Sequence, residues 1–246
     1  MYNIKNKIDY IINFILNKYI LMAPIIISFD GNIGSGKSSI VRYFEKNFAK
    51  YCASKGNTCK ICFLQEPVSI WESIGDANGK SIITHFYENN ERYSFAFQVM
   101  AYTSRLSLLK EALQGDYDVI ISERSVYTDK FVFAKSLYEA KKMTLIEYLI
   151  YLNMFKEFQT IFQDLKIVYI RTKPEICDLR VKQRGRLGET IPLQYLQDCH
   201  HYHDIWLNNP TAIEQGLVLV IDGNEETNTS LFIDNNFYDE VTRKVY

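Results

Sequence analysis

The sequence of 246 residues has few cysteines, few prolines and no apolar run long enough to cross a membrane. Its five cysteines are an odd number in a chain too large to need disulfides, so we expect a reducing compartment, the cytoplasm. The most apolar stretch, 10–22, is interrupted by Asn and Lys and falls short of the ~20 residues of a membrane span. Because the segment before it contains Asp9 and no Arg, a mitochondrial transit peptide is disfavoured.

The sequence also lacks an excess of charge of either sign. Lys and Arg number 28 against 29 Asp and Glu, which argues against a binder of nucleic-acid polymers. Any anionic ligand must therefore meet a local cluster of donors. Disorder is excluded as the overall state because 47% of the residues are hydrophobic. The pair Cys59 and Cys62 has no second pair at zinc-ligand spacing, so we interpret both as reduced thiols.

Five short apolar runs alternate with longer helical patterns, which is typical of βαβ units on a parallel sheet. The runs are Ile25–Phe29, Ile61–Gln65, Val119–Ser122, Ile167–Ile170 and Leu217–Ile221. No repeat and no linker rich in Pro, Gly or Ser divides them, so we expect a single α/β domain over residues 22–246. Residues 1–21 are expected to be a dispensable extension before Met22.

Two helix starts carry the spacing of a capping box. They are Thr144 with Glu147, and Thr172 with Glu175, the second with Pro174 in its first turn. The predicted helix 144–162 is apolar on two sides. Such a helix packs both on its own core and on a partner, so we expect a homodimer through this element.

A phosphate-binding loop follows the first predicted strand. The motif G-x-x-x-x-G-K-S precedes a helical pattern and consists of Gly31, Asn32, Ile33, Gly34, Ser35, Gly36, Lys37 and Ser38, with Ser39 next. Glycines let backbone N–H groups turn inward around phosphate oxygens, and the helix N-terminus adds positive potential. Lys37 is expected to reach the β- and γ-phosphates, and the hydroxyl of Ser38 to ligate Mg²⁺.

Carboxylates follow two other predicted strands. Glu66 comes after the second strand, and Glu123 follows the third, directly before Arg124. Ligands of open parallel sheets bind beyond the carboxyl ends of the strands, so both carboxylates should reach the edge that holds the phosphate loop. Phosphoryl transfer to a hydroxyl needs one carboxylate near Mg²⁺ and another group to accept the proton. No Asn-Lys-x-Asp motif is present, which disfavours a GTPase.

In order and spacing, these motifs resemble the deoxyribonucleoside kinase family, its deoxycytidine and deoxyguanosine kinase type above all. The resemblance runs from about residue 25 to 224, over 31–38, Glu66-Pro-Val-x-x-Trp71, Phe97-Gln98, Glu123-Arg-Ser125, Arg180-x-x-x-Arg184-Gly-Arg186 and Ile191-Pro-Leu-x-Tyr-Leu. It implies a P-loop NTPase-like fold with a five-stranded parallel sheet, flanking helices and a helical lid. It also implies transfer of phosphate from ATP to a deoxyribonucleoside 5′-hydroxyl, for salvage and DNA precursor synthesis.

The resemblance implies a role for each catalytic group. Glu66 would be the general base at the 5′-hydroxyl, Glu123 the carboxylate associated with Mg²⁺, and Arg124 a neighbour of the transferring phosphoryl group. Lid arginines would clamp the ATP phosphates, and a loop after the last strand would hold adenine. The lid residues are Arg180, Arg184 and Arg186, and the loop residues are Asp222, Gly223 and Asn224.

Gln98 and Arg105 lie seven residues apart in a predicted helix over 93–113, so both face one way. The planar amide of Gln98 can pair with the edge of a base. By the resemblance, the aromatic residues that pack on the base are Trp71, Phe97 and Phe133, and the partners of the 3′-hydroxyl are Tyr87 and Glu189.

Base preference is predicted from Arg105 and Asp129, which match deoxycytidine and deoxyguanosine kinases. Arg105 would hold Asp129 ionised, so that the carboxylate accepts from an exocyclic amino group. Thymine offers a carbonyl there and would leave the charge unpaired. We therefore expect deoxycytidine and purine deoxynucleosides to be preferred over thymidine.

Three other interpretations remain open from the sequence: a thymidine-preferring deoxynucleoside kinase, a nucleoside monophosphate kinase of the thymidylate kinase type, and a non-catalytic nucleotide-binding subunit. A monophosphate kinase needs cationic side chains around the phosphate of its acceptor, whereas the carboxylate of Glu66 would repel that phosphate. Intact Lys37, Ser38, Glu66 and Glu123 argue against the subunit. The ranking among deoxycytidine, deoxyadenosine and deoxyguanosine, the donor preference and feedback inhibition are left undecided.

Overall fold

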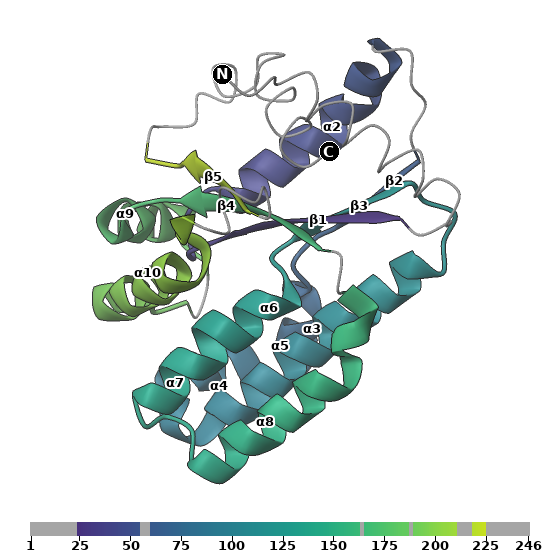
Figure 1. Cartoon of the computed structure of the whole chain (residues 1–246). Helices are drawn as coiled ribbons and strands as arrows, with labels where there is room; N and C mark the ends of the chain where they lie inside the picture. The colour runs from purple at the N-terminus through teal and green to yellow at the C-terminus, as the bar shows by residue number, and fades with distance from the viewer. Residues whose placement is uncertain (1–23, 55–59, 163–164, 187–188, 211–217, 225–246) are drawn as a thin grey trace.

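A parallel sheet of five strands lies at the centre of the computed structural model, which describes residues 24–54, 60–162, 165–186, 189–210 and 218–224 (Figure 1). Its order is β2-β3-β1-β4-β5. The bounds are β1 Ile25–Gly31, β2 Ile61–Leu64, β3 Val119–Glu123, β4 Lys166–Arg171 and β5 Val218–Asp222. The five predicted strands and their parallel arrangement are thereby confirmed. The predicted extension 1–21 and Cys59 lie outside the described residues.

Both faces of the sheet are covered, which explains why its strands are continuously apolar. Ile27 and Phe29 of β1 point to the face of α2 (Lys37–Ser54), where they pack with Phe44. Ile26, the intervening residue, belongs to the larger core on the opposite face, with Tyr102. The register of β1 against β3, with Ile27 opposite Ile121, brings the ends of both strands to one edge.

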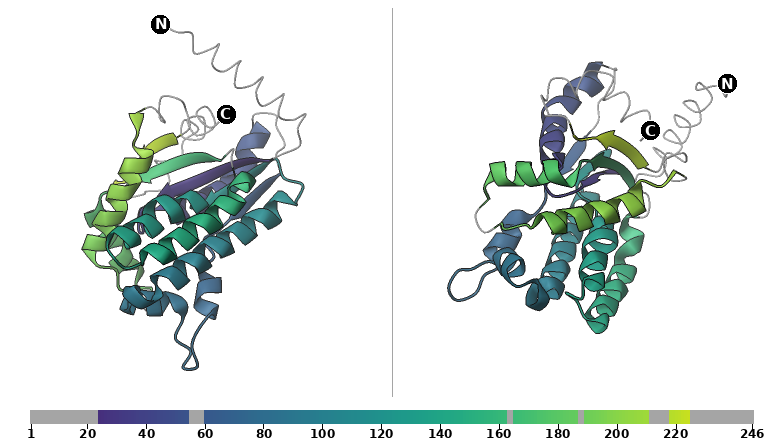
Figure 2. Two further views of the ribbon diagram at one scale, coloured as in Figure 1. Left: turned by 60° about the horizontal axis from the view of Figure 1, so that its bottom comes forward. Right: turned by 90° about the vertical axis from the view of Figure 1, so that its left-hand side faces the viewer.

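Helices form two further groups around the sheet (Figure 2). Below the sheet in Figure 1 lie α3 Val68–Ser73, α4 Ile82–Glu88, α5 Asn90–Leu113, α6 Val126–Thr128, α7 Lys135–Glu139 and α8 Leu145–Phe158. Beside the outer strands lie α9 Pro174–Arg184 and α10 Leu193–Leu207. A π-helix, Asp129–Ala134, joins α6 to α7, and a 3₁₀ turn, Gln159–Phe162, follows α8.

One of the two predicted capping boxes forms. The Thr144 side chain accepts from the backbone N–H of Glu147, whose side chain accepts from the N–H of Thr144. The prediction for Thr172 and Glu175 is wrong, because Lys173 is the N-cap of α9 and makes no side-chain cap. Thr172 is instead buried, and its hydroxyl donates to the carbonyl of Ser35 at 3.1 Å. A tertiary contact has replaced the local one.

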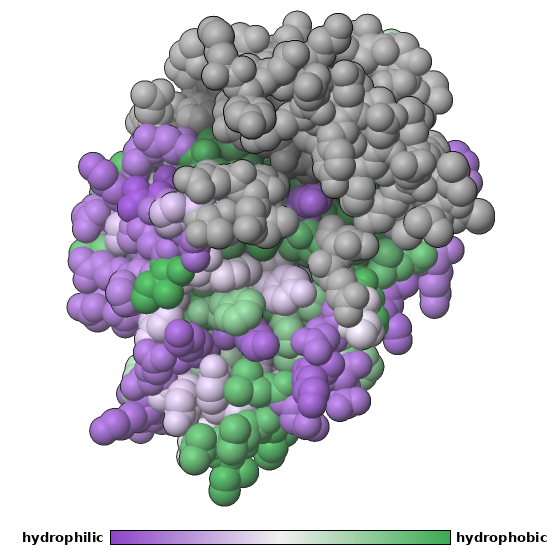
Figure 3. All heavy atoms as spheres, viewed as in Figure 1, coloured by the Kyte–Doolittle hydropathy of each residue, from purple (hydrophilic) through white to green (hydrophobic). Residues whose placement is uncertain are grey.

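The predicted two-sided helix is confirmed as an element with one buried and one exposed apolar side. Tyr151 and Phe155 of α8 are fully buried, whereas Ile146 is 72% exposed. Figure 3 shows hydrophobic residues gathered at the lower end of the molecule, where α8 begins. The exposed large apolar residues on this helix are Leu145, Ile146, Leu149, Ile150 and Phe158. Within the described ranges, no helix combines the length and apolar content that crossing a membrane requires.

Candidate active site

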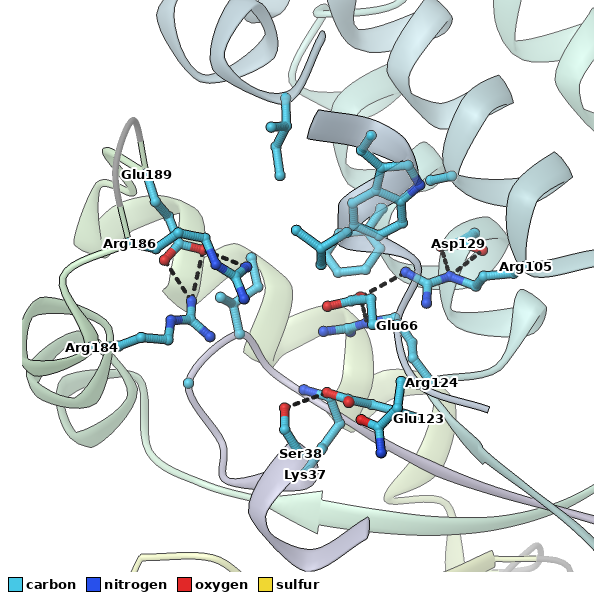
Figure 4. Close-up of a pocket in the computed structure, with 18 of the residues that line it drawn as sticks. Lys37, Ser38, Glu66, Arg105, Glu123, Arg124, Asp129, Arg184, Arg186 and Glu189 are labelled. Carbon is cyan, nitrogen blue, oxygen red and sulfur yellow. Dashed lines mark hydrogen bonds and ion pairs between the residues drawn. The ribbon is translucent and has the colours of Figure 1, made fainter. Parts of the chain in front are cut away.

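A cavity of about 770 Å³ opens beyond the carboxyl ends of the strands (Figure 4). Its walls come from the phosphate loop, the residues after β2 and β3, helices α3 to α5, the π-helix and α9. Most of the predicted site residues meet there: Ile33, Gly34, Gly36, Lys37, Ser38, Ser39, Glu66, Trp71, Tyr87, Phe97, Gln98, Arg105, Glu123, Arg124, Asp129, Phe133, Arg180, Arg184, Arg186 and Glu189.

The phosphate loop has the backbone that its glycines make possible. Gly34 has φ +78°, and a Cβ there would lie 2.5 Å from the carbonyl oxygen of Cys177. Lys37 is 4% exposed, and its Nζ donates to the carbonyl oxygen of Asn32 at 2.6 Å. Burial and the nearby charge of Arg124 lower the pKa of Lys37 to about 7. A cation desolvated in this way gains strongly from an anionic partner.

Two side-chain oxygen atoms that can bind a metal ion lie close together at the start of α2. The Ser38 hydroxyl donates to Glu123 Oε1 at 2.5 Å, and both side chains face the cavity. Hydroxyl and carboxylate oxygens are the ligands of hard divalent cations such as Mg²⁺, which take one or two protein carboxylates plus phosphate oxygens. Among the described residues no group of three or more His, Cys, Asp or Glu could hold a metal. The pair Ser38 and Glu123 therefore suits a metal that arrives with a phosphate ligand.

Asp30, near the end of β1, holds in place the residues that follow β3. It is fully buried, and its Oδ1 accepts from the N–H of Ser125 at 2.9 Å, from the Ser125 hydroxyl at 3.0 Å and from the Thr128 hydroxyl. Its Oδ2 accepts from Ser28 at 2.7 Å. These bonds tie the end of β3 to β1 next to Arg124, which has a left-handed φ of 69°. Asp30 thus holds a strained backbone in place.

Glu66 lies between two guanidinium groups (Figure 4). Its Oε1 accepts from Nη2 of Arg105 at 2.7 Å and from Nε of Arg124 at 3.1 Å. Burial raises the pKa of Glu66, but the charges of Arg105, Arg124 and Lys37 outweigh it and hold that pKa well below its usual range. Glu66 is therefore ionised at neutral pH, with Oε2 left to accept a proton or a hydrogen bond.

Arg105 and Asp129 form the predicted ion pair. Nε of Arg105 donates to both carboxylate oxygens of Asp129, at 3.2 and 3.1 Å, and both side chains are buried. Burial raises the pKa of Asp129 to about 6, although the charges of Arg105 and Arg124 lower it. Asp129 is therefore ionised, as predicted, only at a pH above its pKa of about 6.

Asp129 and Phe133 lie near opposite ends of the π-helix, and both side chains line the cavity. π-Helical segments are frequent at functional sites because they re-aim side chains that a regular helix would place elsewhere. The guanidinium of Arg124 lies 4.8 Å from the centroid of the Phe133 ring. This stacking adds a cation–π contact to the bonds that orient Arg124.

Aromatic rings make the wall around Gln98. Phe97 packs edge-on against Trp71 at 5.4 Å and is stacked with Phe86 at 4.7 Å between ring centroids. The Trp71 indole donates to Ser104 at 2.9 Å, which fixes its orientation. Gln98 is 2% exposed, and within the described part of the chain its Oε1 has no hydrogen-bond partner. A flat, polar-edged ligand fits between such walls.

Two of the three predicted lid arginines, Arg184 and Arg186, share the carboxylate of Glu189. Arg184 Nη2 donates to both oxygens of Glu189 at 2.7 and 2.6 Å, and Arg186 Nη1 lies 3.7 Å from the same carboxylate. Arg180 instead donates to the carbonyl oxygens of Ser35 and Gly223, at 3.3 and 2.9 Å. In Figure 4 the cluster around Glu189 lies across the cavity from Asp129.

The predicted adenine loop is not among the described cavity walls. Asn224 accepts from the N–H of Lys173, the N-cap of α9, at 2.8 Å, and Asp222 accepts from the N–H of Asn224 at 2.9 Å. The phosphate-loop residues Gly31, Asn32 and Ser35 likewise support the cavity without lining it. Asn32, for example, donates to the carbonyl oxygen of Leu196 at 2.8 Å and anchors the loop on α10.

Sequence reasoning missed several residues of the site. Asp30 directly precedes the phosphate loop at the end of a strand, the same signal that identified Glu66 and Glu123, and could have been found by it. The apolar lining had no such signal because it depends on how helices pack. Beside the apolar residues that were predicted, this lining contains Val68, Ile83, Phe86, Ala101 and Tyr195.

Similarity to known proteins extends over most of the chain. Residues 27–245 match the family described as deoxynucleoside kinase. Deoxycytidine kinase 1 of Xenopus laevis is 33% identical over 218 residues, which cover 81% of this chain and 82% of that protein. Human deoxycytidine kinase is 32% identical, covering 81% and 84%. A mitochondrial deoxyguanosine kinase of Xenopus laevis is 29% identical, covering 76% and 74%. This chain therefore belongs to the deoxynucleoside kinase family of ATP-dependent phosphotransferases.

Proposed function

We propose that this chain transfers the γ-phosphoryl group of ATP to the 5′-hydroxyl of a deoxyribonucleoside, in nucleotide salvage for DNA precursor synthesis. One observation carries the proposal: an ionised Glu66, held by two arginines, shares a cavity with a phosphate loop and with an apolar pocket that contains Gln98. A base beside a phosphate site suits a hydroxyl acceptor, whereas an acceptor phosphate would be repelled by Glu66.

The transfer follows from the charges of the site. The 5′-oxygen forms a bond to the γ-phosphorus, the bond from that phosphorus to the bridging oxygen of ADP breaks, and the hydroxyl proton passes to Glu66 Oε2. Charge spreads over the phosphoryl oxygens in the transition state. Lys37 and Arg124, both nearly fully buried, neutralise that charge in surroundings where water screens it little.

Ser38 and Glu123 would hold Mg²⁺, since their oxygens lie 2.5 Å apart on the cavity wall. When bound, the ion supplies charge compensation for the phosphates. Arg184 and Arg186 reach the same cavity from the lid and would contact phosphate oxygens. Tyr87 and Glu189 would receive the 3′-hydroxyl, and burial raises the pKa of Tyr87, so its hydroxyl stays protonated and able to donate. The loop 222–224 would contact the adenine of ATP.

Base choice is proposed to depend on Gln98 and Asp129. An ionised Asp129 accepts hydrogen bonds only, so it favours bases with an exocyclic amino group at that edge, such as N4 of cytosine or N6 of adenine. The unpaired Oε1 of Gln98 offers a second acceptor. Thymine would place a carbonyl oxygen against the buried charge, so we propose deoxycytidine and purine deoxynucleosides as preferred substrates.

Two further proposals concern assembly and location. The exposed side of α8 carries four large aliphatic residues. Because a contiguous apolar patch on a protein surface marks an interaction site, this side supports a homodimer through the helix. The described cysteines Cys62, Cys177 and Cys199 are free, which supports a reducing compartment such as the cytoplasm. Residues 22–246 are proposed to form a single kinase domain, and residues 1–21 to be dispensable.

The proposal is tested by offering deoxycytidine and deoxycytidine monophosphate in parallel, with ATP and Mg²⁺. We expect deoxycytidine to be converted to its 5′-monophosphate and the monophosphate to remain unchanged. Glu66→Gln keeps the size of the side chain but removes the base, and should lower kcat by about 10²- to 10⁴-fold. Phosphorylation of the monophosphate in preference would favour a thymidylate kinase type of activity instead.

A further inference from the structure

We propose that Arg105, which contacts the residue predicted to read the base, is also the positioning residue of the general base Glu66. A single guanidinium would then couple base recognition to phosphoryl transfer. The proposal rests on the function proposed above, because it assigns Glu66 the role of accepting the 5′-hydroxyl proton.

The contacts that carry the inference all come from one side chain. Nη2 of Arg105 is 2.7 Å from Glu66 Oε1, while its Nε lies 3.2 and 3.1 Å from the two oxygens of Asp129. The side chains of Arg105, Glu66 and Asp129 are 6%, 20% and 1% exposed. Water therefore competes little for these bonds. The guanidinium is planar and rigid, so its two carboxylate contacts cannot change independently.

Glu66 depends on such contacts for its orientation. It lies in the turn between β2 and α3, outside any regular element. Its one other described side-chain contact is with Arg124, at 3.1 Å and on the same Oε1. Two donors that approach one oxygen from α5 and from the end of β3 fix the carboxylate plane and leave Oε2 for the substrate. With Arg105 absent, one longer bond would remain, and rotation of the carboxylate would be freed.

The coupling has a kinetic consequence. A base that pairs well with Asp129 leaves Arg105 centred between the two carboxylates, whereas a base that repels Asp129 displaces the guanidinium. Such a displacement moves Glu66 away from the 5′-hydroxyl, and small errors in the placement of a reacting group cost large factors in rate. Selectivity would then appear in kcat as well as in KM.

The role proposed for Arg105 also affects the pKa of Glu66. The groups that face it are Arg105 from α5, Arg124 after β3, Lys37 from the start of α2 and, through Arg105, Asp129 from the π-helix. The three cations favour the ionised carboxylate. Loss of Arg105 removes one of them and shifts the acid limb of the rate profile to higher pH.

The test compares Asp129→Ala with Arg105→Met/Asp129→Ala, using thymidine as the substrate. Removing Asp129 in both variants avoids an orphaned buried carboxylate beside the new methionine and makes thymidine acceptable. Rapid-quench single turnovers with saturating thymidine isolate the chemical step from ADP release. We expect the double variant to react about ten-fold more slowly than Asp129→Ala, with its acid limb at higher pH. Arg105→Lys/Asp129→Ala keeps a cation but not the planar fork and should fall between the two.

Equal single-turnover rates and equal pH profiles in the two variants, with any difference confined to KM, would overturn the proposal, because Arg105 would then act on the base alone. A methionine variant that does not fold leaves the decision to the lysine variant, for which a rate equal to that of Asp129→Ala would count against the coupling. Failure of the proposed function itself is distinguishable, because the unaltered chain would then phosphorylate no deoxynucleoside.

Discussion

The role proposed for Asp129 makes base selection depend on pH in a calculable way. Burial raises the pKa of Asp129 to about 6 in the free protein. An amino group on the base binds the ionised form only, so the pKa must be lower in the complex with deoxycytidine. Below about pH 6 binding must therefore expel a proton, and affinity for deoxycytidine falls as the pH is lowered through this value.

The size of the effect follows from the fraction of Asp129 that remains ionised. At about pH 5, one unit below the pKa, this fraction is about one tenth, so Kd for deoxycytidine should rise about ten-fold, equivalent to ~1.4 kcal/mol. Above about pH 7 the carboxylate is ionised before binding and Kd should be constant. Thymidine lacks the amino group and gains nothing from the ionised form, so discrimination between the two nucleosides should shrink below about pH 6.

Isothermal titration calorimetry of both nucleosides, from about pH 5 to 8 in buffers of different ionisation enthalpy, measures Kd and proton release together. Deoxycytidine should release close to one proton at about pH 5 and none above about pH 7.5, and Asp129→Asn should abolish that release. A Kd for deoxycytidine that does not vary with pH, or a variant that still releases the proton, would refute the assignment of Asp129 as the acceptor.

Three further outcomes are expected. Asp30→Ala leaves buried donors of Ser125 and Thr128 unpaired and should lower the free energy of unfolding by about 3 kcal/mol in urea titrations, whereas Asp116→Ala, 91% exposed, should cost under ~0.5 kcal/mol. Gly34→Ala adds a methyl group 2.5 Å from a carbonyl oxygen and should weaken ATP binding at least ~10-fold by calorimetry; Gly79→Ala, with the same strained φ of +79° but open space, should leave it unchanged. Ile146→Asp should halve the mass measured by light scattering, while Leu179→Asp, 58% exposed on α9, should not; a monomeric parent chain would contradict the dimer.

The sheet was predictable because its strands are largely apolar, as in the run Ile25–Phe29, and because the phosphate loop has a characteristic order of residues. The position of Glu66 and Glu123 at one edge followed from parallel strands alone. These features depend on local composition and on one rule of topology, so a single sequence contains them.

Other features depend on contacts between distant segments. The π-helix that aims Asp129 and Phe133 arises from packing against α5, α8 and α10, and its sequence resembles an ordinary helix. Thr172 has the spacing of a cap but is drawn into the core by the carbonyl of Ser35, 137 residues away. The bond from Arg105 to Glu66 joins residues 39 apart and needs a buried geometry that no spacing rule describes.

The central claim is that this chain is a deoxynucleoside 5′-kinase whose buried Asp129 and Arg105 select the base. The most direct measurement is a competition assay with equal concentrations of deoxycytidine, deoxyadenosine, deoxyguanosine and thymidine, ATP and Mg²⁺, with Glu66→Gln as the inactive control. We predict 5′-monophosphates of the three amino-bearing nucleosides, with thymidine consumed last. Thymidine consumed first, or product formation that survives Glu66→Gln undiminished, would contradict it.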